Sequence, residues 1–403
     1  MRRGGGGGAR TVHEMQDYLR DILWFIGEST YARRGANPEE CDFCFGNPQE
    51  MPLPAVHEAI TRWAAPQNKD WFAYKFSEPS AVKVAVESLK ERHGMNFESA
   101  DVTMTNGAFG ALSATLRAIV DPGDEVIYLA PPWFFYVPMI ISLGGRAVKV
   151  ELPAPGFELP VGAIQQAITE RTRAVIINSP HNPSGRIFQP EELEALAALL
   201  RGASHPIYLI SDESYSRILF DGRPFHTPLR YYDRSFLIYT YGKTLLIPGQ
   251  RVGYVAMPPS MPDREELRAA LMTAQMVNGW GFPNAVMQYA LGDLEQASID
   301  VRALQRRRDR IVSALGEMGY HTVRPAGTFY VLVRSPLADE VAFTERLALE
   351  NVFVMPGRVF ELPGWFRISL TANDDMVERS LPGFAKALAG IAVTASDSLP
   401  GKV

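Results

Sequence analysis

Two polar side chains stand directly after apolar runs that are typical of buried strands. The run PIYLI is followed by SDESY, which places Asp212 where the strand opens and Tyr215 three residues later. The run FLIYTY is followed by Gly242 and Lys243. In open α/β sheets, ligands bind beyond the carboxyl ends of the strands. A buried carboxylate also needs a compensating partner, so Asp212 predicts a site that holds a cationic group.

A third segment predicts an anion site. In TNGAFGAL, residues 105–112, a strand ends at Asn106-Gly107 and a helix begins at once with small residues. The free N–H groups and the positive dipole end of a helix start attract anions such as phosphate. A glycine before a helix also serves ordinary turns. The segment is neither G-x-G-x-x-G nor a Walker loop, which argues against a dinucleotide or ATP site.

Two loops add groups that could contact a flat ligand. The segment NSPHNPSG, residues 178–185, combines asparagines with prolines and a glycine in a rigid loop that presents amide donors at a strand end. Trp133 follows another strand, where its ring could stack on a flat ring or serve ordinary core packing. Cys41 and Cys44 form a lone C-x-x-C without the context of a redox or zinc site, so we expect two reduced thiols and no metal.

The elements that must position these groups are short apolar runs separated by stretches of helical periodicity. Strands alternating with helices predict an α/β fold with a mostly parallel sheet covered on both faces. The last two runs lie only about ten residues apart, too close for a crossover helix, so an antiparallel pair is expected there. The runs are 101–105, 124–130, 145–152, 172–179, 206–212, 236–241 and 251–257.

The flanks of this region predict a second, smaller α+β domain. Apolar residues between Met15 and Ile26 fall at helical spacing, and past residue 300 a charged helix leads to the strand-like runs TFYVLV and WFRISL. A final helix is expected near 375–389. We place the small domain at 12–58 with 301–393, the large domain at 59–300, and flexible tails at 1–11 and 394–403.

Composition narrows the class of protein. The chain has 403 residues, 46% of them apolar, and 40 Lys plus Arg against 45 Asp plus Glu give a net charge near -5. An acidic chain without a basic block is a poor nucleic-acid or membrane binder. No stretch approaches the ~20 apolar residues of a membrane-spanning helix, and the N-terminus lacks the apolar region of a secretory signal. We therefore expect a cytoplasmic globular protein.

Taken in order, Asn182, Asp212 with Tyr215, Lys243 and Arg251 resemble the class I/II aminotransferases, fold-type I enzymes that use pyridoxal 5′-phosphate. The resemblance runs from about residue 14 to 390. It includes the turn around Gly46 and the segments PAGTFYVL, VMPGRVF and FRISL. It implies the fold-type I architecture, with a mostly parallel seven-stranded sheet in the large domain.

The resemblance also implies a role for each group around the cofactor ring. Lys243 would form the internal aldimine and shuttle the Cα proton. Asp212 would pair with the pyridinium nitrogen and preserve the electron sink. Asn182 and Tyr215 would bond the ring hydroxyl oxygen, and Trp133 would stack on the ring.

Further roles concern the phosphate, the substrate and a second subunit. Arg367 would clamp the substrate α-carboxylate with two parallel hydrogen bonds, beside Asn182 and the turn at Gly46. Tyr74 resembles the tyrosine that reaches the phosphate of the neighbouring subunit, so a homodimer with shared active sites is expected. The residues expected around the phosphate are Gly107, Ala108, Thr240 and Arg251, and Phe109 is expected to contact the cofactor.

The sequence departs from the family pattern in three places. Thr240 and Gly242 stand where many members have a serine, and the glycine that usually follows the tyrosine near Tyr74 is missing. The region that supplies a second arginine in dicarboxylate-specific members, about 269–300, has no Arg or Lys. With Tyr241, Trp280 and Phe282 as expected pocket walls, we predict a preference for neutral, medium to large amino donors over aspartate.

The leading hypothesis is a transaminase that moves an amino group from an L-amino acid to a 2-oxo acid by a ping-pong route. Another pyridoxal phosphate reaction on the same scaffold, such as that of a β-lyase, a cyclising synthase or an oxidase, stays open. A non-catalytic effector-sensing domain is disfavoured by the acidic charge. A Rossmann dehydrogenase is disfavoured by the absence of G-x-G-x-x-G.

Overall fold

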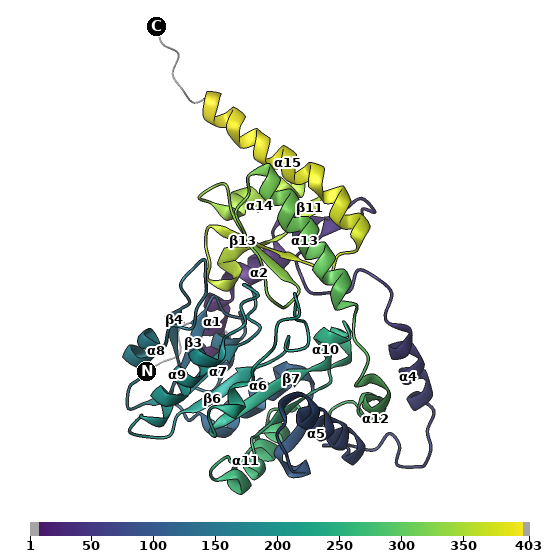
Figure 1. The fold of residues 1–403 in the computed structure, drawn as a ribbon, viewed down its shortest axis with the longest axis vertical. Coiled ribbons are helices and arrows are strands. Elements are labelled where there is room, and N and C mark those ends of the chain that lie inside the picture. The colour runs from purple at the N-terminus through teal and green to yellow at the C-terminus, as the bar shows by residue number, and fades with distance from the viewer. Residues whose placement is uncertain (1–7, 398–403) are drawn as a thin grey trace.

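The computed structural model describes residues 8–397, and most of both predicted tails lies outside this range. Figure 1 shows a large sheet with its helices in the lower part of the molecule and a smaller sheet with α13 (Val301–Met318), α14 (Glu340–Leu349) and α15 (Asp374–Asp397) above it. The last helix extends to Asp397, beyond the end expected near 389. Within residues 8–397 no helix is long and apolar enough to cross a membrane.

The large sheet confirms the predicted α/β architecture. Within the described residues it has seven strands in the order β2-β8-β7-β6-β5-β3-β4. The five from β4 to β7 are parallel, and β8 runs antiparallel to both β7 and β2, as the short spacing predicted. The strands are β2 (Val102–Thr105), β3 (Glu125–Ala130), β4 (Arg146–Glu151), β5 (Thr172–Asn178), β6 (Tyr208–Asp212), β7 (Ser235–Thr240) and β8 (Gly253–Ala256).

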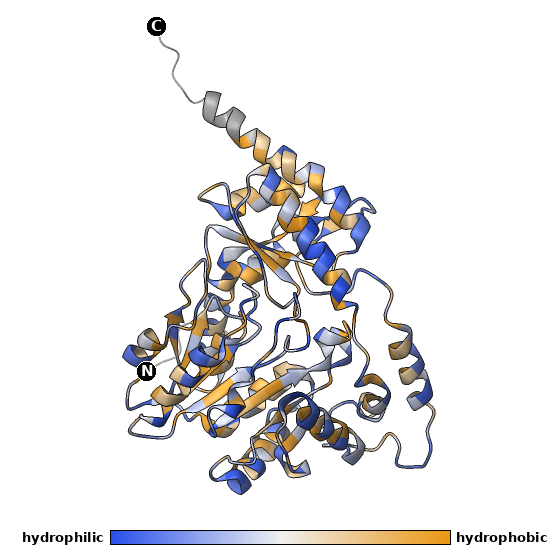
Figure 2. Ribbon diagram, viewed as in Figure 1, coloured by the Kyte–Doolittle hydropathy of each residue, from blue (hydrophilic) through white to orange (hydrophobic). Residues whose placement is uncertain are grey.

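Helices cover both faces of this sheet, because successive residues of a strand point to opposite sides. Ile176 and Ile238 pack with α6, α7 and α11 on one face, whereas Val175 and Leu209 pack with α8 and α9 on the other. Figure 2 shows the result as apolar strands among helices with hydrophilic outer faces. The helices are α6 (Gly107–Ile119), α7 (Tyr136–Ser142), α8 (Val161–Ala167), α9 (Pro190–Arg201) and α11 (Arg264–Val277).

The smaller sheet has the order β12-β13-β10-β9 and is antiparallel. One face of this sheet packs against α13 and α15. These are the charged helix past residue 300 and the final helix that the sequence predicted. A separate parallel pair joins β1 (Cys41–Asp42) to β11 (Val352–Phe353). The strands of the sheet are β9 (Thr322–Val323), β10 (Tyr330–Arg334), β12 (Met355–Pro356) and β13 (Trp365–Ser369).

The N-terminal segment contacts both halves. The arm expected between Met15 and Ile26 forms two helices, α1 (Arg10–Tyr18) and α2 (Arg20–Gly27). Helix α1 packs against α7, and α4 (Pro54–Ala64) packs against α12 (Ala285–Leu294). The segment 12–58 therefore does not lie against the small sheet alone, and the exact domain boundaries stay a prediction. The remaining helices are α3 (Thr30–Arg33), α5 (Pro79–His93) and α10 (Tyr241–Thr244).

A buried carboxyl group stands beside the end of β6. Glu213 is 1% exposed, and its Oε1 accepts hydrogen bonds from Thr227 Oγ1 at 2.6 Å and Ser211 Oγ at 3.0 Å. Burial raises the pKa of Glu213 to about 8. Burial also lowers the pKa of His93, whose Nε2 lies 4.0 Å from Glu213 Oε2, to about 4. Between these values both groups are neutral and do not form an ion pair.

The raised pKa of Glu213 predicts a pH-dependent stability. Between the pKa of an exposed glutamate, about 4.3, and about 8, the folded state holds a proton that the unfolded state has lost, so stability falls as pH rises. The Glu213→Gln variant lacks this proton. We expect its stability advantage over the wild type to grow by about 1.4 kcal/mol per pH unit between pH 5 and 7. Unfolding midpoints of both proteins across this range measure the effect, and parallel pH profiles would contradict the assignment.

Candidate functional site

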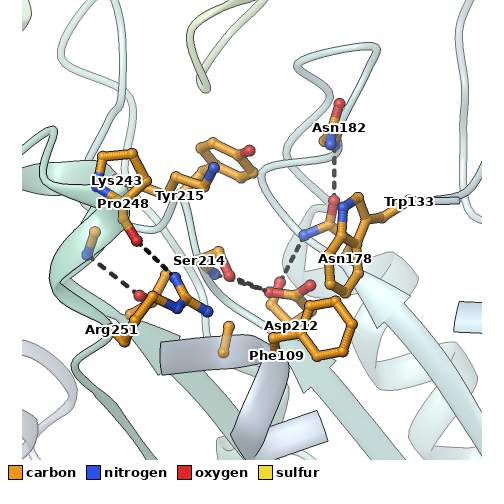
Figure 3. Close-up of a pocket in the computed structure, with 13 residues that line it drawn as sticks. Phe109, Trp133, Asn178, Asn182, Asp212, Ser214, Tyr215, Lys243, Pro248 and Arg251 are labelled. Atoms are coloured by element: carbon orange, nitrogen blue, oxygen red, sulfur yellow. Dashed lines mark hydrogen bonds between the residues drawn. The ribbon is translucent and has the colours of Figure 1, made fainter. Parts of the chain in front are cut away.

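A cavity of ≈ 190 Å³ opens where the parallel strands β5, β6 and β7 end. Asn178, Asp212 and Thr240 are the last residues of these strands, and all three line it. Figure 3 shows the lining side chains converging on one space. The other lining residues are Ala108, Phe109, Trp133, Asn182, Ser214, Tyr215, Gly242, Lys243, Pro248 and Arg251. Most residues that the sequence singled out are thus brought together.

Asp212 is 5% exposed, and both of its carboxylate oxygens accept hydrogen bonds. Oδ1 accepts from Ser214 Oγ at 2.6 Å and from the Ser214 backbone N–H at 3.1 Å, and Oδ2 accepts from Tyr136 at 2.6 Å. Burial raises the pKa of Asp212, while these donors oppose the rise. No cationic side chain of the described residues lies within ion-pair distance of it. The carboxylate therefore faces the cavity with its charge available to a cationic ligand group.

Lys243 and Tyr215 line the cavity, and Tyr330 lies beside Tyr215. The Lys243 Nζ is 5.7 Å from the ring centre of Tyr215 and 5.6 Å from that of Phe329. Burial raises the pKa of Tyr215, whose hydroxyl bonds to Tyr330. Burial would also raise the pKa of Tyr330, but Arg367 and Lys243, with the bond from Tyr215, hold it below its ordinary value. Of the two tyrosines, Tyr330 therefore has the lower pKa, and the nearby charge of Lys243 contributes to this.

The start of α6 and Arg251 form a corner of the cavity whose donor groups could hold an anion. Gly107 has φ 71°, and a Cβ at this position would lie 3.1 Å from Arg251 Nη2. The guanidinium donates to the carbonyls of Pro248 at 2.7 Å and Asn106 at 3.2 Å. Thr240 Oγ1 accepts from the Gly242 N–H at 3.2 Å and so caps α10. Free N–H groups of a helix start beside a guanidinium suit a phosphate group.

Arg367 on β13 reaches from the small sheet to the large one. It is 3% exposed, its Nη1 donates to Asn182 Oδ1 at 3.0 Å, and its Nη2 donates to the Cys44 carbonyl at 3.0 Å. The guanidinium carbon lies 3.9 Å from the ring centre of Tyr330. Its Nε is buried and has no partner among the described residues. An incoming carboxylate would satisfy this N–H group.

Gly46 lies where the chain passes closest to Phe329 and Tyr330. A Cβ at Gly46 would lie 2.4 Å from the Phe329 ring and 2.9 Å from the Tyr330 hydroxyl oxygen. The Gly46 N–H also donates to that hydroxyl. The nearby Cys41 and Cys44 are buried and unpaired. Gly46 therefore holds Tyr330, and through it Arg367, in place.

Four aromatic residues named from the sequence do not line the cavity: Tyr74, Tyr241, Trp280 and Phe282. Tyr74 is 85% exposed and packs on Phe282, with ring centres 4.8 Å apart. Its contact with a neighbouring subunit stays a prediction. Tyr241 is 1% exposed and donates to Glu295 at 2.7 Å, so the expectation that it forms a pocket wall is wrong. It follows β7 on the side that packs into the core.

Sequence reasoning missed four residues that complete the site. Asn178 donates its Nδ2 to the Asp212 carbonyl at 2.8 Å and accepts from the Asn182 N–H at 2.7 Å, which fixes the loop after β5. Ser214 and Tyr136 hold the Asp212 carboxylate, and Tyr330 stacks on Arg367. The place of Asn178 at a strand end and of Ser214 two residues after Asp212 were usable signals. Nothing in the sequence links Tyr136 to Asp212, 76 residues away.

The sequence of this chain is similar to those of known proteins over most of its length. Residues 38–382 match the family model described as aminotransferase class I and II. The chain belongs to this family. The aminotransferase is 34% identical over 345 residues to the aspartate/prephenate aminotransferase of Thermus thermophilus, covering 83% of this chain and 87% of that protein. It is 31% identical over 350 residues to an arginine–pyruvate transaminase of Pseudomonas aeruginosa, covering 84% and 86%.

Solved structures agree on the fold of this aminotransferase. An amino transferase from Eubacterium rectale superposes with a TM-score of 0.83 at 30% identity, covering 96% of each chain. The Thermus thermophilus aspartate aminotransferase with maleate superposes with a TM-score of 0.79 at 29% identity, covering 96% of this chain and 100% of that one. The resemblance inferred from the sequence and the fold-type I architecture are therefore confirmed.

The close approach at Gly46 generates a prediction. A methyl group in Gly46→Ala must displace the Phe329 ring or Tyr330, so we expect a loss of about 1–3 kcal/mol in the free energy of unfolding. The matched control is Gly27→Ala, an exposed helical position where nothing lies within 4 Å of the added Cβ. There alanine should be neutral or stabilising. Chemical denaturation of the three proteins compares them, and equal effects of the two substitutions would contradict this account.

Proposed function

We propose that this aminotransferase binds pyridoxal 5′-phosphate covalently through Lys243 and moves an amino group from an L-amino acid to a 2-oxo acid by a ping-pong route. The observation that carries the proposal is the convergence of Lys243, the buried Asp212 carboxylate and the Arg251 corner on one cavity, with Arg367 beside it. The family and the relatives named as transaminases support it.

The residues present fit this cofactor. A pyridinium nitrogen would supply the cationic partner that Asp212 lacks among the described residues, and a phosphate group matches the N–H groups at the start of α6 with Arg251. Trp133 offers a ring face on the cavity wall. When bound, pyridoxal phosphate supplies an aldehyde that an amine can attack and a ring that accepts electrons from the substrate Cα.

The chain's own groups orient the substrate and move the proton. Arg367 binds the α-carboxylate through its free Nε–H, and Asn182 holds the guanidinium in place. The Lys243 amine accepts the proton from Cα and later returns one. Tyr215 and Asn182 offer polar groups on the same wall. Ser214 and Tyr136 keep the Asp212 carboxylate oriented toward the ring nitrogen.

A second copy of this chain is proposed as the partner. Phe72, Tyr74 and Phe76 expose 61%, 85% and 39% of their surface, and Trp280 and Phe282 expose 41% and 48%. The rings of Tyr74 and Phe76 each lie 4.8 Å from that of Phe282. Contiguous exposed aromatic groups mark interaction surfaces. Trp280 continues this patch to Phe109 in the cavity, so a subunit that covers the patch also borders the active site. The cytoplasmic location stays a prediction.

The function is tested at Lys243. The purified wild type, treated with borohydride and digested, should yield a cofactor-labelled peptide that contains residue 243. It should also transfer the amino group of a donor to a 2-oxo acid without release of ammonia. Lys243→Ala should lose the label and nearly all turnover, while Lys386→Ala, at an exposed ion pair with Glu350, should keep both. A label on another lysine, or ammonia as the product, would contradict the proposal.

The assembly is tested by sedimentation. The wild type should sediment as a dimer at micromolar concentration. Replacing Tyr74 and Phe282 together with serine should shift the equilibrium toward monomer and reduce turnover in proportion, because the rings that the partner covers are lost. A wild type that is fully active as a monomer would show that the aromatic patch has another role.

A further inference from the structure

Each charged group of the cavity already has a role in the proposed function. Arg251 stands at the anion corner, Lys243 is the attachment point, and Asp212 faces the ring nitrogen. Arg367, bonded to Asn182 next to the cavity, takes the α-carboxylate. Among the described residues that line the cavity, no further cation remains for a second carboxylate on the substrate.

The wall opposite Arg251 is aromatic. Phe109, the third residue of α6, lines the cavity together with Trp133, and Figure 3 shows both rings on the side away from Arg251. The ring centre of Phe109 lies 5.2 Å from that of Trp133, edge-on, and 5.1 Å from that of Phe135, tilted, and these contacts restrict the orientation of the Phe109 ring. A fixed ring offers apolar surface to a ligand without a large loss of side-chain freedom.

This wall continues out of the cavity to Trp280. The ring centres of Phe109 and Trp280 are 6.5 Å apart, and the Trp280 carbonyl accepts a hydrogen bond from Asn106 Nδ2 at 2.9 Å. The bond holds Trp280 beside the start of α6. Aromatic rings therefore lead from the interior of the cavity, through Phe109 and Trp280, to the exposed aromatic patch.

We infer that this site selects L-amino acids with aromatic or bulky apolar side chains, and that Phe109 is a specificity-determining residue. The inference rests on the proposed function. A side-chain carboxylate placed against Phe109 would lose water and gain no charge partner. An aromatic or branched side chain would bury apolar surface there. The chain would then differ in amino donor from the relatives named as aspartate aminotransferases.

The wild type provides the first test. We expect kcat/KM for L-phenylalanine and L-leucine to exceed that for L-aspartate by at least about tenfold, the scale on which pockets discriminate side chains. L-alanine is the reference, because its methyl group is too short to reach the wall and it reports the shared machinery. If alanine is turned over and aspartate is the best of the four donors, this inference is wrong but the proposed function stands. Failure of all four amino acids to donate overturns this inference, and it overturns the proposed function as well only where Lys243 also carries no borohydride-fixed cofactor.

Variants at Phe109 assign the selection to this residue. Phe109→Lys supplies the missing cation, so the phenylalanine-to-aspartate ratio of kcat/KM should fall at least about tenfold, and Phe109→Leu should keep apolar donors ahead of aspartate. The control is Phe225→Leu, which removes a ring that packs on His93 and neither contacts Phe109 nor lines the cavity, and it should leave the ratio unchanged. A ratio that stays within twofold in Phe109→Lys would exclude Phe109 as the determinant.

Equilibrium binding gives a readout independent of turnover. Calorimetry with 3-phenylpropionate and succinate, which present an α-carboxylate with a phenyl ring or a second carboxylate, should show tighter binding of 3-phenylpropionate to the wild-type holoenzyme. The order should reverse or equalise in Phe109→Lys. Tighter binding of succinate to the wild type would overturn the inference, whatever the kinetic result.

Discussion

The buried carboxylate of Asp212 is the constraint on which the site depends. It stands at the end of β6 with Oδ1 bonded by Ser214 and Oδ2 by Tyr136, and its backbone carbonyl accepts from Asn178. A charge at this depth persists only where donors surround it and a cation completes the set. Strands β5 and β7, which flank β6 on either side, bring Asn178 and Thr240 to the same edge. The parallel part of the sheet thus serves to hold one negative charge at the floor of a cavity.

The strands and the chemistry at their ends were predictable from the sequence, because alternating apolar runs and polar strand ends are local signals. All seven runs of the large sheet are strands, including the antiparallel pair β7 and β8. Lys243, Asp212 and Asn182 meet in one cavity because parallel strands end at one edge. The association of Arg367 with Asn182 followed only from the resemblance to a family, since 185 residues separate them.

What the sequence could not predict are contacts that depend on side-chain direction or on distant pairing. Tyr241 directly precedes Gly242 and Lys243, which line the cavity, yet its ring packs into the core near Arg217 and its hydroxyl bonds to Glu295. Tyr136 reaches Asp212 because α7 packs on the same face of the sheet, a relation that no local pattern contains. The Phe109 ring could not be placed by spacing, because the first turn of a helix can direct a side chain toward either the sheet or the cavity.

Arg367 carries one more consequence. Its guanidinium is bonded at once to Asn182, in the loop after β5, and to the Cys44 carbonyl, in the segment that leads from β1, while its own strand belongs to the small sheet. Three parts of the chain thus meet at a single ligand-binding group. A carboxylate that bonds to the remaining Nε changes the strength of those two contacts, so ligand binding and the relative placement of the two sheets are thermodynamically linked. Any substitution that alters the packing of the sheets against each other should therefore also change the affinity for amino acids, even when it lies far from the cavity.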